Sequence, residues 1–288
     1  MTRSRTLVAA LLLPAALALG ACGSDDDQPD STPSAAKPAN ACAKADLSLK
    51  EPGQLTVGTD SPAFPPYFVD DDPTNGEGFE SAVAYAIAEQ LGFQASEVKW
   101  TVVPFNSSYA PGPKKFDFDV NQISITPPRA KRVDFSEPYY TAPQAIVALK
   151  KAGAANAASL ADLSDAQLGV QIGTTSLDAV TEIVKPSRQP KVFNDSNDIV
   201  AALKQGQVDA VAVDLPTAFY LTAAQVPSAK IVGQFSGPEG DDWGALLQKD
   251  SELTPCVNQA LAKLGESGEL EQITQKWMGA SAGAPELR

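Results

Sequence analysis

The chain has 288 residues, which is long enough for two domains that each bury a core. Its 22 basic and 35 acidic residues give a net charge of −13, and no basic cluster follows the first few residues, so a nucleic-acid partner is not expected. Histidine is absent, which excludes nucleophile systems that depend on it, and the sequence offers no ligand set for a metal. Composition therefore favours binding over catalysis, with no cofactor or metal.

The first 21 residues have the three-part form of a secretory signal peptide. Two arginines precede an apolar run over residues 7–19, which is too short for a stable membrane span. The tetrad LGAC that ends at Cys22 resembles the bacterial lipobox, so Cys22 is predicted to carry lipid; the alternative is an ordinary secretory cleavage nearby. Residues 22–44 are polar, acidic and rich in proline, and are predicted to form a flexible tether.

Two further cysteines remain, Cys42 at the end of the tether and Cys256 near the end of the folded part. An even number of cysteines in an exported chain indicates a disulfide, and the alternative is two unpaired buried thiols. If the bond forms, the beginning and the end of the fold lie in the same lobe.

The first half of the folded part begins with a predicted strand at 55–59 and a turn-rich loop. Apolar residues then recur at helical spacing up to Gly92, which predicts an amphipathic helix over 78–92. Strands are predicted at 98–103 and 116–125, whereas two prolines in 106–115 argue against a good helix there.

The second half alternates strands and helices, which predicts an α/β fold with a mainly parallel sheet covered by helices on both faces. The predicted strands are 168–173, 191–193, 208–214, 231–235 and 243–249, and the predicted helices are 174–185, 196–206, 251–265 and 268–277. The tail 280–288 is predicted to be loose.

Arg129 stands in the first turn of a short predicted helix, after Thr126 as N-cap and two prolines. A cation is unfavourable at the positive end of the helix dipole, so an anion is expected in front of it. A guanidinium together with free backbone N–H groups makes a good carboxylate receptor. The alternative is an arginine in a surface ion pair.

Two more segments suggest an amino-acid site. Thr174 and Thr175 follow a strand and Gly173 at a predicted helix start, where they offer N–H groups and hydroxyls. Asp214 ends a predicted buried strand, a position where an acid can receive an ammonium. One carboxylate receptor and one ammonium receptor describe an α-amino acid. The alternatives are threonines that only cap their helix, and Asp214 as the cap of a helix from Leu215.

Five segments stand in the order found in the family 3 extracellular solute-binding proteins, which serve ABC importers for polar amino acids. They are VGTDSPAFPPYF, GFESAVAYAIAEQLGF, ISITPPRAKRVDFSEPYY, LGVQIGTTSLDAV and VDAVAVDLPTAF, and the likeness extends over about 54–279. The resemblance implies a two-lobed venus-flytrap fold of the periplasmic-binding-protein-like type II, with two hinge crossings. Lobe 1 would comprise 45–142 and 236–279, which includes Cys256, and lobe 2 would comprise 143–235.

The resemblance also implies roles for the site residues. Arg129 and Thr175 would hold the ligand carboxylate, Asp214 would hold its ammonium, and Ser124 would add a hydroxyl or backbone contact. The remaining members of the implied ligand-binding set are Asp60, Phe64, Phe105, Gln122 and Thr174. Phe64 and Phe105 match the aromatic sandwich of the family, with a core position as the alternative, and Asp60 has a turn-capping alternative.

The chain departs from the family pattern at three places, namely Ala82, Asn121-Gln122 and 106–115. An amide of Asn121 or Gln122 is expected to reach the ligand side chain, and 106–115 is expected to reshape the pocket wall.

The resemblance implies a monomeric lipoprotein that is not an enzyme. It would lie at the outer face of the cytoplasmic membrane and deliver a polar amino acid to ABC permease subunits. One alternative is a cyclohexadienyl-type dehydratase on the same fold, with Glu80 or Asp60 as the acid or base. The other is a ligand-sensing lipoprotein.

Overall fold

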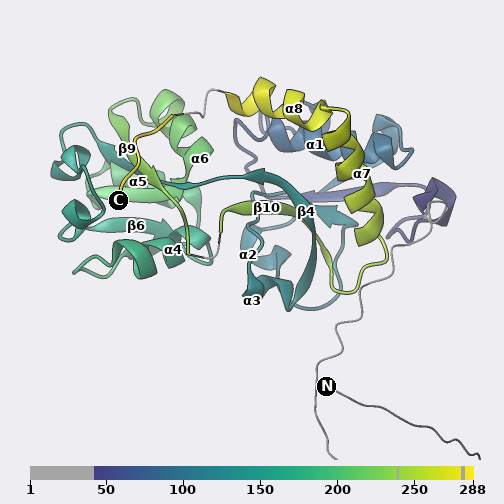
Figure 1. Ribbon diagram of the computed structural model, residues 1–288, viewed down its shortest axis with the longest axis horizontal. Helices are drawn as coiled ribbons and strands as arrows, with labels where there is room; N and C mark the ends of the chain where they lie inside the picture. Colours follow the sequence, from purple (N-terminus) through teal and green to yellow (C-terminus); the bar gives the residue numbers. More distant parts are fainter. Residues whose placement is uncertain (1–41, 239, 280–282) are drawn as a thin grey trace, which may run out of the picture. The chain divides into compact units, whose positions relative to one another are not determined.

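The computed structural model describes residues 42–238, 240–279 and 283–288 (Figure 1). The signal peptide, the lipid site at Cys22 and nearly all of the tether lie outside these residues. Among the helices that are described, none has the length and apolar character needed to span a membrane.

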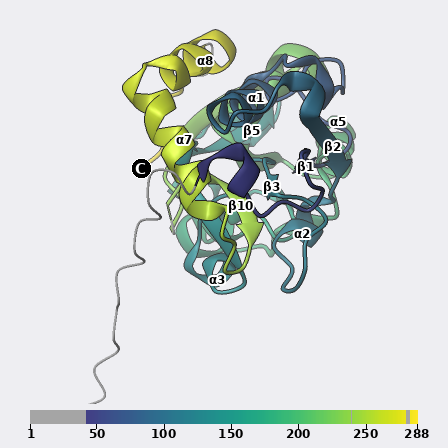
Figure 2. The same ribbon diagram turned by 90° about the vertical axis from the view of Figure 1, so that its right-hand side faces the viewer.

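The first sheet has the strand order β2-β1-β3-β10-β4. Its strands are β1 (Leu55–Thr59), β2 (Val98–Val102), β3 (Phe118–Asp119), β4 (Val133–Thr141) and β10 (Asp242–Gln248). Three helices pack against one another and against this sheet, α1 (Phe79–Gln90), α7 (Thr254–Glu266) and α8 (Glu269–Met278) (Figures 1 and 2). Phe79, Val83 and Ile87 recur every four residues along α1, and their burial in the common core holds that helix in place.

The second sheet has the order β7-β6-β8-β5-β9. Its strands are β5 (Gln144–Leu149), β6 (Leu168–Gln171), β7 (Lys191–Phe193), β8 (Ala210–Asp214) and β9 (Ala229–Phe235). Its helices are α4 (Thr175–Ala179), α5 (Ser196–Lys204) and α6 (Leu215–Tyr220), and π-helical turns continue α4 and α6. Separate apolar clusters pack on this sheet, one of them with α4 and the other with α5 and α6.

Each sheet is mixed, so the expectation of a mainly parallel sheet is wrong. β1 runs parallel to β2 and β3, and β6 runs parallel to β7 and β8, as the alternating pattern predicts. The antiparallel strands are those that join the sheets. The chain leaves the first sheet by β4, enters the second by β5, leaves it by β9 and returns by β10. Because β4 pairs with β10 and β5 with β9, the two passages lie side by side and run in opposite directions.

The strand predicted at 116–125 shortens to β3, and Ser124 pairs only through an isolated bridge to Trp243. The cause is local, because Gln122 adopts a left-handed conformation with φ 48° and donates its backbone N–H to Glu80. A residue in that conformation interrupts a strand.

A disulfide joins Cys42 to Cys256 in α7, with 5.3 Å between the two Cα atoms. The pairing expected from the cysteine count is therefore present in the structure. It connects the beginning of the described chain to the core between α1, α7 and the first sheet.

Residues 283–288 are not loose, contrary to the expectation for the tail. The backbone of Gln234 in β9 donates to the Pro285 carbonyl (2.7 Å) and accepts from Leu287 N–H (2.8 Å). The Leu287 side chain is 4% exposed in the second sheet's core. A Cβ on Gly233 would come within 2.6 Å of both Leu287 Cγ and the Pro285 oxygen, so a glycine is needed there. The composition of the tail does not predict this contact, because the contact depends on β9, which lies elsewhere in the chain.

We expect Leu287→Ala to lower the free energy of unfolding by about 2 kcal/mol, since it removes a buried leucine from the second sheet's core. Urea unfolding followed by tryptophan fluorescence and circular dichroism measures the change. Glu286→Ala is the matched control, since it keeps the tail backbone and removes only an exposed contact to the Gln234 amide. A tail that contributes nothing would leave both variants at the wild-type midpoint.

Candidate functional site

A cavity of about 110 Å³ lies between residues of the two sheets, which belong to one compact unit of the chain. This space would hold several water molecules, and so a small polar molecule. All nine ligand-binding residues predicted from the sequence line it, namely Asp60, Phe64, Phe105, Gln122, Ser124, Arg129, Thr174, Thr175 and Asp214. The fold thus brings together side chains that are up to 154 positions apart, from Asp60 to Asp214.

Arg129 sits in the single-turn helix α3 (Pro127–Ala130), and the Thr126 hydroxyl caps this turn by accepting from Arg129 N–H. The Arg129 side chain donates to the Ser124 carbonyl (2.8 Å) and the Gly173 carbonyl (2.9 Å). Its guanidinium carbon also lies 4.8 Å from the ring centre of Tyr109. At 7% exposure Arg129 is buried, so it is not an arginine of a surface ion pair.

The start of α4 faces α3 across the cavity. Thr174 caps α4, since its hydroxyl accepts from Leu177 N–H (3.3 Å) and donates to the Gln171 carbonyl (2.8 Å). Thr175 is buried, and its hydroxyl lies 3.2 Å from that of Ser124. The capping interpretation therefore holds for Thr174, whereas Thr175 joins the group around Arg129.

Asp214 ends β8 and precedes α6, but its side chain forms no capping hydrogen bond to that helix. Its Oδ1 accepts instead from the Gln144 amide at 2.6 Å. Burial raises the pKa of Asp214 to about 7, and the Gln144 hydrogen bond opposes this shift. The helix-cap interpretation of Asp214 is therefore wrong.

Asp60, Phe64 and Phe105 also line the cavity. The Asp60 carboxylate accepts from the backbone N–H groups of Ser61 (2.7 Å) and Phe105 (3.2 Å), so it fixes the turn after β1 and the start of α2 (Phe105–Ser108). Asp60 therefore caps the turn, as the alternative interpretation states, and it also lines the cavity. The Phe64 ring lies 6.3 Å from that of Tyr220, in the second lobe.

Glu80 holds Gln122 from behind the cavity. Its carboxylate accepts from the backbone N–H of Gln122 (2.7 Å), from the Gln122 side-chain amide and from the Tyr139 hydroxyl (2.5 Å). Burial raises the pKa of Glu80 to about 7, whereas these donors lower it. Glu80 is not among the residues that line the cavity, which argues against it as a general acid or base toward a molecule bound there.

The cavity is also lined by residues outside the ligand-binding set predicted from the sequence, notably Gln171, Ser176, Ser196 and Thr217, and by Asn121, which was named only as an alternative to Gln122. The Nδ2 atom of Asn121 is buried and has no hydrogen-bond partner among the described residues, so it can donate to a bound molecule. The sequence indicates this position, because Asn121-Gln122 departs from the family pattern. The serines and threonines lie at helix starts that come together only in the folded chain.

Asp119 lies in β3 behind the cavity and is 0% exposed. Within the described part of the chain, neither of its oxygens has a hydrogen-bond partner. Burial raises the pKa of Asp119 well above its ordinary value, and the nearby Glu80 and Asp60 add to the effect, whereas Lys114 opposes it. The carboxyl is therefore protonated over a wider pH range in the folded protein than in the unfolded chain.

We expect Asp119→Asn to stabilise the protein increasingly as the pH rises. Below about pH 4 the acid is protonated in both the folded and the unfolded chain, so ionisation costs nothing. As the pH rises toward the folded-state pKa, the wild type loses stability that the amide variant keeps, by about 1–3 kcal/mol at pH 8. Urea unfolding at pH 4, 6 and 8 measures the difference, and a difference that stays constant with pH would contradict the prediction.

Among the described residues, no group of three or more acidic or cysteine side chains is arranged to hold a metal ion. The cavity is lined by the buried guanidinium of Arg129 and by the carboxylates of Asp214 and Asp60, together with hydroxyls and amides. Such a set can bind a small molecule that carries both charges.

Two α/β lobes with mixed sheets, two adjacent passages and a polar cavity between them define a two-lobed, periplasmic-binding-protein-like solute-binding protein. The chain belongs to the bacterial extracellular solute-binding proteins, family 3, whose family model matches residues 55–280. It is 30% identical to the L-cystine-binding protein TcyJ of Escherichia coli (strain K12) over 237 residues, which is 81% of this chain and 85% of that protein.

Other similar proteins agree with this assignment. The arginine-binding extracellular protein ArtP of Bacillus subtilis (strain 168) is 31% identical over 78% of this chain and 86% of its own length. Among solved structures, an ancestral arginine-binding protein bound to glutamine is 34% identical with a TM-score of 0.67, over 79% of this chain and 98% of that one.

Proposed function

We propose that this protein is the extracytoplasmic substrate-binding lipoprotein of an ABC importer and binds a polar α-amino acid or a related zwitterion. The observation that carries the proposal is the convergence of Arg129 and Asp214, from different lobes, on one cavity. A guanidinium can grip both oxygens of a carboxylate, and a carboxylate pairs with an ammonium. No single strand or helix supplies both charges, so the site exists only when the lobes face one another.

In this proposal Arg129, Ser124 and Thr175 hold the ligand carboxylate, and Asp214 holds the ammonium. Phe64 and Phe105 enclose the side chain, with Thr174 at the edge of the site. The ligand docks on lobe 1, and closure of lobe 2 adds Thr175 and Asp214 and removes water. Contacts that support this closure join the lobes, namely Ser124 with Thr175, Arg129 with Gly173, and Tyr67 with Thr217 at 2.7 Å.

The chemistry around the ligand side chain favours a polar substrate. Asp60 offers a negative charge, and Asn121 and Gln122 offer amides. The relatives are named for cystine, arginine and histidine, all of which carry polar or charged side chains. We propose the same class for this protein.

The N-terminal features complete the proposal. After cleavage, lipid on Cys22 would anchor the monomeric chain at the outer face of the cytoplasmic membrane, and residues 22–44 would act as a tether. The closed form would then be recognised by the permease subunits of the importer.

Calorimetric titration tests the proposal. The mature chain without its lipid, refolded to remove carried-over ligand, would be titrated with the twenty amino acids, cystine, opines and betaines. We expect submicromolar binding of one polar amino acid. Failure of every compound in the panel would show that the carboxylate and ammonium assignments are wrong.

An enzyme on the same fold is the second candidate, and one observation favours it. A solved ancestral amino acid-binding protein, described as a precursor of cyclohexadienyl dehydratase, is 31% identical with a TM-score of 0.64. The engaged and recessed position of Glu80 speaks against this activity here. Turnover of a cyclohexadienyl acid by the purified protein would support the enzyme, and its absence together with amino-acid binding would support the receptor.

A ligand-sensing lipoprotein would use the same site. Loss of amino-acid uptake when the gene is deleted would support transport, whereas intact uptake with a lost response to the ligand would support sensing.

A further inference from the structure

We propose that Gln144 is a positioning residue of the ammonium site, which holds the Asp214 carboxylate toward the cavity in its charged form. The inference rests on the proposed function, in which Asp214 receives the ligand ammonium. It adds a residue that the cavity wall does not contain, because Gln144 acts through Asp214 and Ser176.

The position of Gln144 follows from strand register. Gln144 is the first residue of β5, immediately after the chain has passed from the first sheet to the second. In the antiparallel pair of β5 and β8 it lies directly opposite Asp214, the last residue of β8. Opposite residues in an antiparallel pair project to the same face of the sheet, so the two side chains meet there. Gln144 is 0% exposed.

Both ends of the Gln144 amide are used. The Ser176 hydroxyl donates to Oε1 at 2.6 Å, and Nε2 donates to Asp214 Oδ1 at 2.6 Å. The opposite amide orientation would place an oxygen against the carboxylate, so the network requires the N–H group to face Asp214. Within the described part of the chain, Oδ2 of Asp214 accepts no hydrogen bond, which leaves this atom for a ligand.

The charges around Asp214 explain why one hydrogen bond matters. Burial and the acids Asp241 and Glu80 favour the neutral form, whereas Gln144 and Arg129 favour the ionised form. Burial raises the pKa of Tyr67 and of Tyr140, and the charge of the Asp214 carboxylate adds to this effect. Gln144 is the largest of the influences that oppose burial. It also hydrogen-bonds toward Asp241 and lowers the pKa of that group.

A proton and the ligand ammonium compete for Asp214. A protonated carboxyl is a weak partner for an ammonium, so amino-acid affinity falls as the pH drops through the pKa of Asp214. Without Gln144, this loss of affinity would begin at a higher pH. A residue that served only to fill space would leave the pH profile unchanged.

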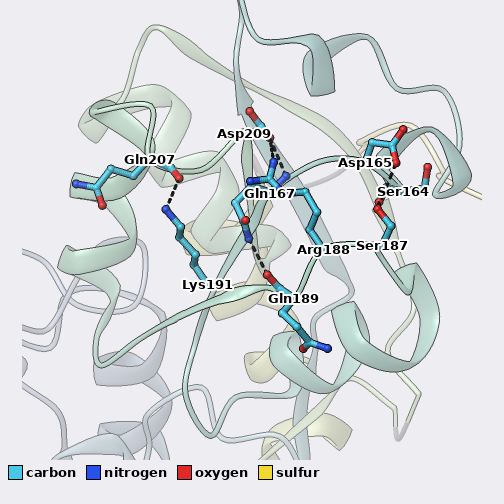
Figure 3. A network of polar contacts seen from close by, with 9 residues as sticks. All are labelled: Ser164, Asp165, Gln167, Ser187, Arg188, Gln189, Lys191, Gln207 and Asp209. Carbon is cyan, nitrogen blue, oxygen red and sulfur yellow. Dashed lines mark hydrogen bonds and ion pairs between the residues drawn. The ribbon is translucent and has the colours of Figure 1, made fainter.

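The first test measures the pKa of Asp214 in the free protein, by ¹³C NMR titration of the aspartate carboxyls, with Asp214→Asn to assign the signal. In Gln144→Leu we expect the pKa of Asp214 to rise by about one to two pH units, because a hydrogen bond to a charged group is lost. Gln167→Leu is the matched control. Gln167 is also a buried glutamine of the second lobe, but its amide donates to the Gln189 carbonyl at 2.7 Å in the network drawn in Figure 3, none of whose residues lines the cavity.

The second test measures binding of L-arginine, L-cystine and L-histidine between pH 5.5 and 8.5 by calorimetry. At pH 7 we expect Gln144→Leu to bind the amino acid about 10- to 100-fold more weakly than the wild type does. The difference in affinity between the two proteins should become smaller as the pH rises. Gln167→Leu should keep the wild-type profile. If Gln144→Leu does not fold, Ser176→Ala replaces it, because it frees the Gln144 amide to rotate and should shift the pKa of Asp214 in the same direction, by less.

The outcomes separate this inference from the proposed function. A wild-type pKa of Asp214 and a wild-type binding profile in Gln144→Leu would overturn the role of Gln144 while leaving the receptor intact. If the wild type binds none of the amino acids in the titration panel, the proposed function fails and the ammonium site fails with it.

Discussion

Arg129→Ala is expected to weaken amino-acid binding by about 2–5 kcal/mol, which is roughly 30-fold to several thousand-fold, while the protein stays folded. The variant would leave the ligand carboxylate in a cavity without its cationic partner. It would also remove the hydrogen bond from the guanidinium to the Gly173 carbonyl, which joins the lobes. Calorimetry with the amino acid found in the panel measures the loss, and urea unfolding checks the fold.

Arg188→Ala is the matched control for this prediction. Arg188 also belongs to the folded part, but its exposed side chain pairs with Asp209 at 3.9 Å on the second lobe (Figure 3), and neither residue lines the cavity. An exposed pair of this kind contributes little to stability or binding. Affinity of the Arg129 variant within about threefold of the control would contradict the assignment of Arg129 to the ligand carboxylate.

Removal of the disulfide is expected to lower the free energy of unfolding by about 5 kcal/mol on the chain-entropy model. The bond joins residues separated by 214 positions, so it restricts the unfolded chain strongly. The double variant Cys42→Ser, Cys256→Ser should therefore unfold at a much lower urea concentration. Ligand binding should persist under native conditions, because neither cysteine lines the cavity.

A reductant provides the control for the disulfide. Dithiothreitol should lower the unfolding midpoint of the wild type toward that of the double variant and should leave the variant unchanged. Equal midpoints of the oxidised wild type and the variant would show that the cross-link contributes nothing.

Local features of the site were predictable because they depend on neighbouring residues. Thr126 and the two prolines define the turn that carries Arg129, and Thr174 caps α4, which was the alternative given for this residue. Both are short-range preferences of the backbone that a sequence expresses directly. The cysteine pairing was also open to prediction, since it needs only an even count in an exported chain.

The partners of buried polar groups were not predictable. The sequence predicts Asp214 as an ammonium receptor, but the amide that binds its carboxylate comes from β5, and no local pattern indicates this pairing. Glu80 was considered only as an acid or base, whereas in the fold it holds Gln122 and Tyr139. The packing of Leu287 on β9 was missed for the same reason.

The sequence by itself determined which residues carry the site's charges, where the turns and caps fall, and that the chain forms strands and helices in alternation. Periodicity and capping are local properties, so they can be read from adjacent positions. Only the tertiary structure decided the mixed character of the sheets, the opposition of Gln144 to Asp214, and the meeting of Arg129 with α4. These depend on strand register and on the crossing of the chain between two sheets, which bring together residues that are far apart in the sequence.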